Sequence, residues 1–337
     1  MAKHHDTGYK ELFNHPEFVQ QLIEGFAPAE IAALMDFSTL KNHSGNYITP
    51  LFEERFEDVV WSVQVHWQGV TERLFLYLLI EFQSTVDPTM PLRMLHYVAC
   101  FYQHLLKTKV TTPAQGLPPI LPIVLYNGLE RWQVAEDIDE LVRPTPPLFL
   151  RAYQPHLRYH LIDEGRYTPE QLGLIDSPLS AVFGVEIASR DRALLQVAVD
   201  RLVRLIQADP NKARLDRLIT RWLKRHLQRL GAQIDLTQIH SLVEDTAMLA
   251  ENLQHWAERE RQEGERIGLQ RGRQEGRQEG RQEGRQEGRQ EGEQIGMQKT
   301  AQATARNLIA LGLLNDAQIA QATGLSVAQV EALRADK

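Results

Sequence analysis

The feature that most constrains the fold is an uninterrupted apolar run, Leu74–Ile80, followed directly by Glu81, Phe82 and Gln83. Seven apolar residues in succession are typical of a strand in the middle of a sheet, where both faces are covered. Because side chains alternate along a strand, Glu81 and Gln83 should share one face and Phe82 should lie on the other. A carboxylate at the end of so apolar a strand needs a partner or a metal ion, since burying an unpaired charge is costly.

A second acidic residue, Asp58, opens the neighbouring apolar segment Val59–Val65. If the two segments pair as strands joined by a hairpin, the carboxylates of Asp58 and Glu81 come close together. Two carboxylates and the polar Gln83 at one sheet edge would form a site for a hard divalent cation such as Mg²⁺ or Mn²⁺. The alternatives are an ordinary strand-start carboxylate for Asp58 and a hydrogen-bonding edge residue for Gln83.

Composition excludes several classes of protein. The 337 residues, 43% of them hydrophobic, suffice for one large domain or two modest ones. The single Cys100 excludes an internal disulfide and, with no export signal at the start, favours a cytoplasmic location. No apolar run approaches the ~20 residues of a membrane helix, so we expect no membrane partner. The net charge of −7 argues against indiscriminate nucleic-acid binding but permits a local basic surface.

Hydrophobic periodicity and turn residues predict an α/β core over residues 1–185. Its expected elements are helices over 9–26, 29–35 and 92–107 and strands over 47–52, 58–65, 74–83, 120–126 and 157–163. Residues 186–257 read as a helical, partly basic extension. Its cations have two interpretations, a solvated helix face or a cradle for a phosphate backbone. The candidates for DNA-backbone contacts are Arg214, Arg217, Arg221, Lys224 and Arg225.

A glycine recurs every fourth residue from Gly264 to Gly296, and the repeat Arg-Gln-Glu-Gly is near-perfect between Arg273 and Gly292. As a helix this segment would be weak, because each Gly costs ~1 kcal/mol relative to Ala and like charges stack at i,i+4. Arg and Glu two residues apart lie on opposite sides of a helix, so stabilising charge pairs would have to come from another copy or chain. We therefore predict a flexible or partner-stabilised linker over residues 258–299 and homo-oligomers formed through the tail.

Residues 300–337 predict a small helical module. Asp316 and Ser326 are expected to cap helices on either side of a turn at Gly324. The pattern has the form of a helix-turn-helix, but its second helix offers only Arg334 as a cation, which favours a capping or association module over a DNA reader.

Several motifs in this order resemble one family. They are His5–Phe13, Asp58–Trp61, Leu79–Thr85, Met90–Tyr97 and Leu121–Gly128. Together they resemble the bacterial Rpn family of recombination-promoting nucleases, also labelled putative transposases (YhgA-like). The resemblance covers residues 4 to about 240. That family is similar to PD-(D/E)XK nucleases, whose mixed central sheet is flanked by helices and delivers an Asp and a Glu-x-Lys.

The resemblance implies a metal-dependent DNA endonuclease acting in recombination or on mobile DNA. Asp58 and Glu81 would be the metal ligands, and Gln83 would stand where the superfamily usually carries Lys. A Gln can hydrogen-bond but cannot supply the positive charge that a Lys brings to developing negative charge. Residues considered for accessory roles are Lys10, Glu11, Arg93 and Asp163.

Two other functions remain open from the sequence. The missing Lys and the negative net charge favour a catalytically weak DNA- or protein-binding module. A transposase with three catalytic carboxylates would need Asp163 to complete the set.

Overall fold

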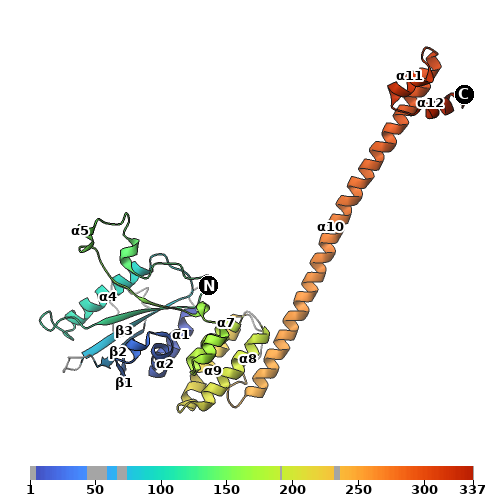
Figure 1. The fold of residues 1–337 in the computed structure, drawn as a ribbon. Helices are drawn as coiled ribbons and strands as arrows, with labels where there is room; N and C mark the ends of the chain where they lie inside the picture. Colours follow the sequence, from blue (N-terminus) through green and yellow to red (C-terminus); the bar gives the residue numbers. More distant parts are fainter. Residues whose placement is uncertain (1–4, 44–58, 67–73, 190–191, 231–235, 337) are drawn as a thin grey trace. The chain divides into compact units, whose positions relative to one another are not determined.

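The computed structural model describes residues 5–43, 59–66, 74–189, 192–230 and 236–336 (Figure 1). It divides into two compact units, residues 1–258 and residues 259–337. The predicted strand at 47–52 and the predicted metal ligand Asp58 lie outside the described residues.

The first unit is built on a mixed five-stranded sheet in the order β1-β2-β3-β4-β5. The first three strands pair antiparallel, and β3, β4 and β5 run parallel. The strands are β1 (Met35–Asn42), β2 (Val59–Val65), β3 (Leu74–Gln83), β4 (Ile120–Tyr126) and β5 (His160–Asp163). The apolar run predicted as a central strand is β3, which has a neighbour on each side. The α/β class is confirmed.

Helices cover both faces of this sheet (Figure 1). On one face α4 (Met90–Lys107) packs against alternate residues of β3 and β4, including Leu79 and Val124. The intervening residues, among them Ile80 and Phe82, point into a larger core on the other face. That core is closed by α1 (His5–Phe13), α2 (Pro16–Phe26), α7 (Pro178–Ala188), α8 (Arg192–Ala208) and α9 (Lys212–Arg229). The two faces of β3 therefore belong to two separate clusters.

Short elements connect these layers. They are α3 (Ala29–Ala32), η2 (Ile138–Leu141), α5 (Leu148–Arg151), η3 (Glu164–Arg166) and α6 (Pro169–Leu174).

The single helix predicted over residues 9–26 is wrong, because the chain forms α1 and α2 with a break at Asn14 and His15. Pro16 causes the break, since proline disfavours helical geometry at the residue before it and suits the first turn of a new helix. The predicted helix over 29–35 is also too long, because it ends at Ala32 and Met35 begins strand β1.

The repeat, predicted as a flexible or partner-stabilised linker, is helical. It forms the middle of α10 (Thr246–Leu311), one continuous helix of 66 residues. The start of α10 is held by Leu249, Leu253 and Trp256, which are buried in the core of the first unit. Once a helix is nucleated by packing, each further residue adds a backbone hydrogen bond, so propagation can tolerate weak helix formers.

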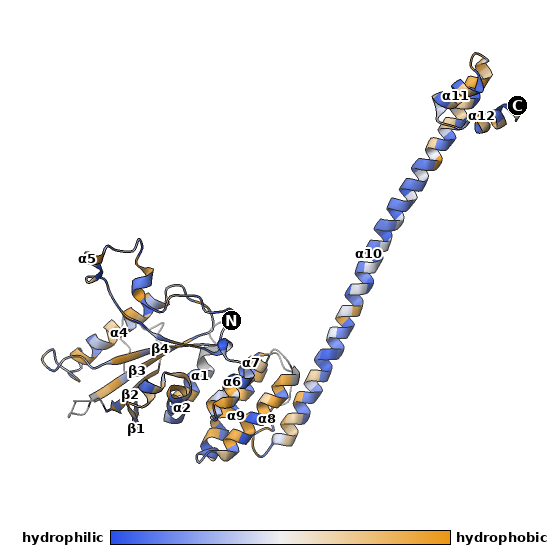
Figure 2. Cartoon of the chain, viewed as in Figure 1, coloured by the Kyte–Doolittle hydropathy of each residue, from blue (hydrophilic) through white to orange (hydrophobic). Residues whose placement is uncertain are grey.

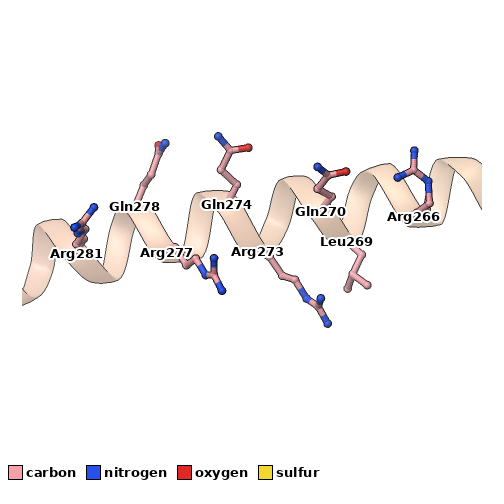
Figure 3. Close-up of a pocket in the computed structure, with 8 residues that line it drawn as sticks. All are labelled: Arg266, Leu269, Gln270, Arg273, Gln274, Arg277, Gln278 and Arg281. Atoms are coloured by element: carbon pink, nitrogen blue, oxygen red, sulfur yellow. The ribbon is translucent and has the colours of Figure 1, made fainter.

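The surface of α10 is polar through the repeat, as Figure 2 shows. In Figure 3, Gln270, Gln274 and Gln278 lie in one row along the helix, and Arg273 and Arg277 lie in another. Ion pairs three or four residues apart, such as Arg271–Glu275 and Arg289–Glu293, include a residue outside the strict repeat units. The four-residue period therefore keeps Arg and Glu apart within the repeat.

The second unit ends in α11 (Asp316–Thr323) and α12 (Val327–Ala335). Asn315, rather than the predicted Asp316, caps α11, and Ser326 caps α12 as predicted. Gly324 has a φ of 74°, a left-handed conformation that glycine adopts without steric cost. Ala305, Ile309, Ile319, Ala320 and Val330 form a small core that joins both helices to the end of α10.

Candidate functional site

The carboxyl end of β3 presents Glu81 and Gln83 on the face that α4 covers. Leu79, two residues before Glu81, belongs to the cluster on the α4 side, whereas Ile80 and Phe82 belong to the other core. Glu81 is 3% exposed, so its carboxylate is held inside the protein. The alternation predicted for residues 81–83 is confirmed.

Arg93 of α4 is the ion-pair partner of this carboxylate. Its Nη2 lies 2.5 Å from Glu81 Oε1, and its Nη1 lies 2.7 Å from Asp87 Oδ2. Gln83 Nε2 donates to the same Glu81 oxygen at 2.6 Å. Arg93 also donates to the Tyr97 hydroxyl at 3.0 Å, one turn further along α4. Gln83 and Arg93 thus both contact the buried carboxylate of Glu81, and Tyr97 and Asp87 join the group through Arg93.

The pKa shifts in this group follow from burial and from the ion pair. Burial alone would lower the pKa of Arg93, but the charge of Glu81 and the bonds to Asp87 and Tyr97 outweigh it and raise that pKa. Burial raises the pKa of Tyr97, and the negative charge of Glu81 raises it further. The guanidinium is therefore fixed in its charged form, and Tyr97 is kept as a neutral phenol.

The pairing of β2 with β3 concerns Asp58 and Glu81, the two carboxylates predicted to come close together. Val59, the first residue of β2, is paired with Ile80, the residue before Glu81. Asp58 precedes Val59 in the sequence and lies outside the described residues.

Asp163 ends β5 on the α4 side of the sheet, but the structure does not bring it to Glu81. Tyr126 of β4 is paired with both Gln83 and Asp163, so β4 separates β3 from β5. Two strand spacings correspond to ~10 Å. The Asp163 carboxylate accepts from the backbone N–H of Gly165 at 3.1 Å and pairs with Arg166 at 3.3 Å. Asp163 therefore caps η3, the short helix that follows β5.

Lys10 and Glu11 lie on α1, which packs on the face of the sheet opposite Glu81. Glu11 pairs with Arg221 at 3.1 Å and also with Arg225, both on α9. Neither accessory candidate from the first helix therefore lies with Glu81, whereas Arg93 contacts it directly.

Four of the five candidate DNA-backbone residues line a single cavity of about 500 Å³ on α9. These are Arg214, Arg217, Arg221 and Lys224, and the other polar residues of the lining are His15, Thr220 and His240. We call this cavity the basic pocket. Because α9 packs into the core opposite α4, the basic pocket lies across the sheet from Glu81.

A group that sequence spacing could not reveal lies on the connection between β4 and β5. Asp137, Asp139 and His156 could hold a metal ion, since their ligand atoms lie within 4.8 Å of one another. An isolated bridge between Asp137 and Arg158 brings the two segments together. Asp137 is buried, and the other two residues are exposed.

A buried polar cluster between α1, η3, α7 and α9 was also missed. The Tyr9 hydroxyl donates to Glu164 Oε2 at 3.0 Å, and Glu186 lies 3.3 Å from His226 Nδ1. Burial raises the pKa of Glu164 well above its ordinary value, and the negative charge of Glu186 raises it further. Both effects on the pKa of Glu164 favour its neutral acid over the carboxylate.

None of the helices in the described part of the chain combines the length and hydrophobicity that a membrane crossing needs.

Comparison with known proteins identifies relatives of this chain. Recombination-promoting nuclease RpnA of Escherichia coli (strain K12) is 33% identical over 126 residues, which are 37% of this chain and 40% of RpnA. RpnC of the same strain is 33% identical over 125 residues, 37% of this chain and 39% of RpnC. The matched segments therefore span well under half of either relative.

A third relative matches over a longer stretch. The inactive recombination-promoting nuclease-like protein RpnE of the same strain is 25% identical over 269 residues, 79% of this chain and 84% of RpnE. No solved structure matches the chain significantly. The model of the family described as "Putative transposase, YhgA-like" matches residues 3–216, which is more than half of the sequence. The chain belongs to this YhgA-like family and is similar in sequence to recombination-promoting nucleases.

Proposed function

We propose that the protein is a divalent-metal-dependent DNA endonuclease of the PD-(D/E)XK type that acts in recombination or on mobile DNA. The observation that carries the proposal is the buried carboxylate of Glu81 at the carboxyl end of a central strand, with Gln83 on the same face. The names of RpnA and RpnC, both recombination-promoting nucleases, support the reaction class.

The donors proposed for the metal are hard oxygen atoms, as Mg²⁺ and Mn²⁺ prefer. Glu81 offers a carboxylate, and we propose Asp58, which directly precedes Val59, as the second one. Bound there, a divalent ion would lower the pKa of a water molecule and offset the charge of a phosphodiester. Gln83 is proposed to orient that water or the substrate by hydrogen bonding.

Arg93 carries the positive charge that Gln83 lacks. A permanent positive charge lies in hydrogen-bond contact with Glu81, on the α4 side of the sheet. Its fork of N–H donors suits phosphate oxygens as well as carboxylates. We propose that Arg93 stabilises negative charge on the scissile phosphate, the task that a Lys performs in the Glu-x-Lys motif.

Plasmid nicking in the presence of Mg²⁺ tests the proposal. The wild type should convert supercoiled plasmid to the nicked form, and Asp58→Ala and Glu81→Ala should each lower the rate by at least about a hundredfold. Circular dichroism of both variants checks that the fold persists. Retained cleavage by nuclease-free Asp58→Ala would sink the metal-ligand assignment.

A second function is favoured by a specific observation. Arg93 already neutralises Glu81, and RpnE, a relative that matches over 79% of this chain, is named inactive. The protein would then bind DNA or protein without cleaving it. Isothermal titration with Mn²⁺ separates the two functions, because only the nuclease requires binding that Glu81→Ala abolishes.

We also propose that copies of the chain associate through α10. The strict repeat separates Arg from Glu by two residues, which places the two rows on roughly opposite sides of the helix. A second α10 could place its Glu row against the Arg row of the first. Light scattering should give a larger multiple of the chain mass for the full chain than for a chain ending at residue 258, and equal multiples would refute the association.

A further inference from the structure

The basic pocket holds a row of cations and lies far from Glu81. Arg214, Arg217, Arg221 and Lys224 follow one another at steps of three, four and three residues along α9. These steps keep all four within ~80° of one another around the helix axis. The row extends over ~15 Å, because a helix rises 1.5 Å per residue. A ligand that engages the whole row must itself be an extended chain of negative charges.

Two of these cations are held by carboxylates of the first two helices. Arg214 pairs with Glu17 at 2.8 Å, and Arg221 pairs with Glu11 at 3.1 Å. Arg214 also donates to His15 Nδ1 at 2.8 Å, so this nitrogen is an acceptor rather than a protonated site. These contacts fix the positions of the two side chains and connect α9 to the N-terminal helices.

The other two cations have no such partner among the residues that the structure describes. Arg217 is exposed and bonds to the carbonyl of Ala213 in its own helix. Lys224 is partly exposed, and its charge is among the causes that lower the pKa of Asp245, after the backbone N–H groups of His240 and Ser241. Arg217 and Lys224 therefore carry most of the positive charge left to attract a ligand.

A nucleic-acid strand matches this row better than a single anion does. Phosphates follow one another at a rise of 3.4 Å per nucleotide along a duplex strand, so ~15 Å corresponds to about four nucleotide steps. A single anion would meet only part of a row of this length, whereas a backbone that continues past both of its ends would meet all of it.

We propose that the basic pocket binds the phosphate backbone of a DNA segment at a site distinct from Glu81, on the opposite face of the sheet. The choice of DNA as the ligand rests on the proposed function, whereas the site itself does not depend on cleavage. A nuclease with such a site could hold one stretch of DNA while another lies at the carboxyl end of β3.

Fluorescence anisotropy with a short labelled DNA duplex, in EDTA so that no metal site is occupied, tests the proposal. The full chain is titrated as wild type and as Arg217→Gln/Lys224→Gln. The pocket variant should bind roughly tenfold more weakly, and the slope of log K against log salt should fall by about 2, one for each lost phosphate contact.

A matched control removes two charges elsewhere. Arg204 on α8 and Lys107 on α4 are exposed and have no ion-pair partner among the described residues. The variant Arg204→Gln/Lys107→Gln should keep the affinity and the salt slope of the wild type. Equal losses in both double variants would overturn the proposal, because they would show a general effect of net charge.

Two more outcomes would overturn it. One is an unchanged salt slope in Arg217→Gln/Lys224→Gln. The other is displacement of the duplex from the pocket by poly-glutamate at equal charge concentration, which would identify a site for acidic proteins. A protein that fails to nick plasmid but loses duplex affinity in the pocket variant would refute the endonuclease function alone.

Discussion

Glu81 and Arg93 form an ion pair whose members differ in burial, with side chains 4% and 32% exposed. Removing the guanidinium leaves a buried carboxylate with less compensation. We therefore expect Arg93→Ala to lower the free energy of unfolding by roughly 1–3 kcal/mol, less than for a fully buried pair because water screens the arginine. Urea unfolding measures this change.

The double variant Glu81→Gln/Arg93→Ala provides the control for that pair. It removes the charge that Arg93 compensates, so it should be more stable than Arg93→Ala alone. Wild-type stability in Arg93→Ala would show that the pair contributes nothing to the fold.

Glu164 gives a prediction with a definite sign in pH. Burial and Glu186 raise its folded-state pKa above the unfolded value. The stability that the protonated group contributes is present below the unfolded pKa of about 4.3 and is lost as pH rises through the higher folded pKa. Glu164→Gln cannot titrate, so its stability should fall less than that of the wild type between pH 5 and pH 8. The difference between the two slopes measures the free energy that is linked to the raised pKa of Glu164. Urea unfolding at the two pH values measures this change. An equal loss of unfolding free energy in the wild type and in Glu164→Gln would contradict the prediction.

At the scale of elements, the glycines of α10 are a source of local instability. A Cβ added at Gly276, Gly280 or Gly284 would meet nothing within 4 Å. Replacing each with Ala should stabilise the helix by ~1 kcal/mol without steric conflict. Where amide hydrogens of α10 exchange by local opening of the helix, each replacement should slow their exchange by about fivefold. Unchanged or faster exchange would show that the glycines serve a packing contact with another molecule.

The sequence predicted elements well where a run of apolar residues or a cap determines them. The predicted bounds of β3 and β4 agree with the structure because both strands are continuous hydrophobic segments. Strand β1 was missed because its sequence, MDFSTLKN, is half polar, as suits an edge strand that is only partly buried. The break before α2 could have been read from Pro16.

The candidate site was predictable only in part. Alternation placed Glu81 and Gln83 on one face, because it depends on local geometry alone. The contact of Arg93 with Glu81 depends on where α4 lies on the sheet, and the pairing of Glu11 with α9 joins residues more than two hundred positions apart. Sequence spacing carries no information about either tertiary contact.

At the scale of the whole molecule, the core of the first unit extends into the start of α10. Leu249, Leu253 and Trp256 are each less than 5% exposed. A chain ending at residue 258 should therefore unfold within about 2 °C of the corresponding transition of the full chain, because no core residue is lost.

A chain ending at residue 245 should be several kcal/mol less stable, because each large apolar side chain contributes about 1.5–3 kcal/mol when buried. Calorimetry of the three lengths checks both expectations. Equal transitions at 245 and 258 would show that the start of α10 is dispensable for the core.

The uniform repeat gives α10 a length that can change in fixed steps. One more Arg-Gln-Glu-Gly unit would extend the helix by ~6 Å and turn its end by ~40°. Since the inserted side chains would meet open space, as at the existing glycines, units could be gained or lost without a packing penalty. The number of units would thus set both the length of the helix and the direction in which its end faces. About nine added units would turn that end through one full revolution.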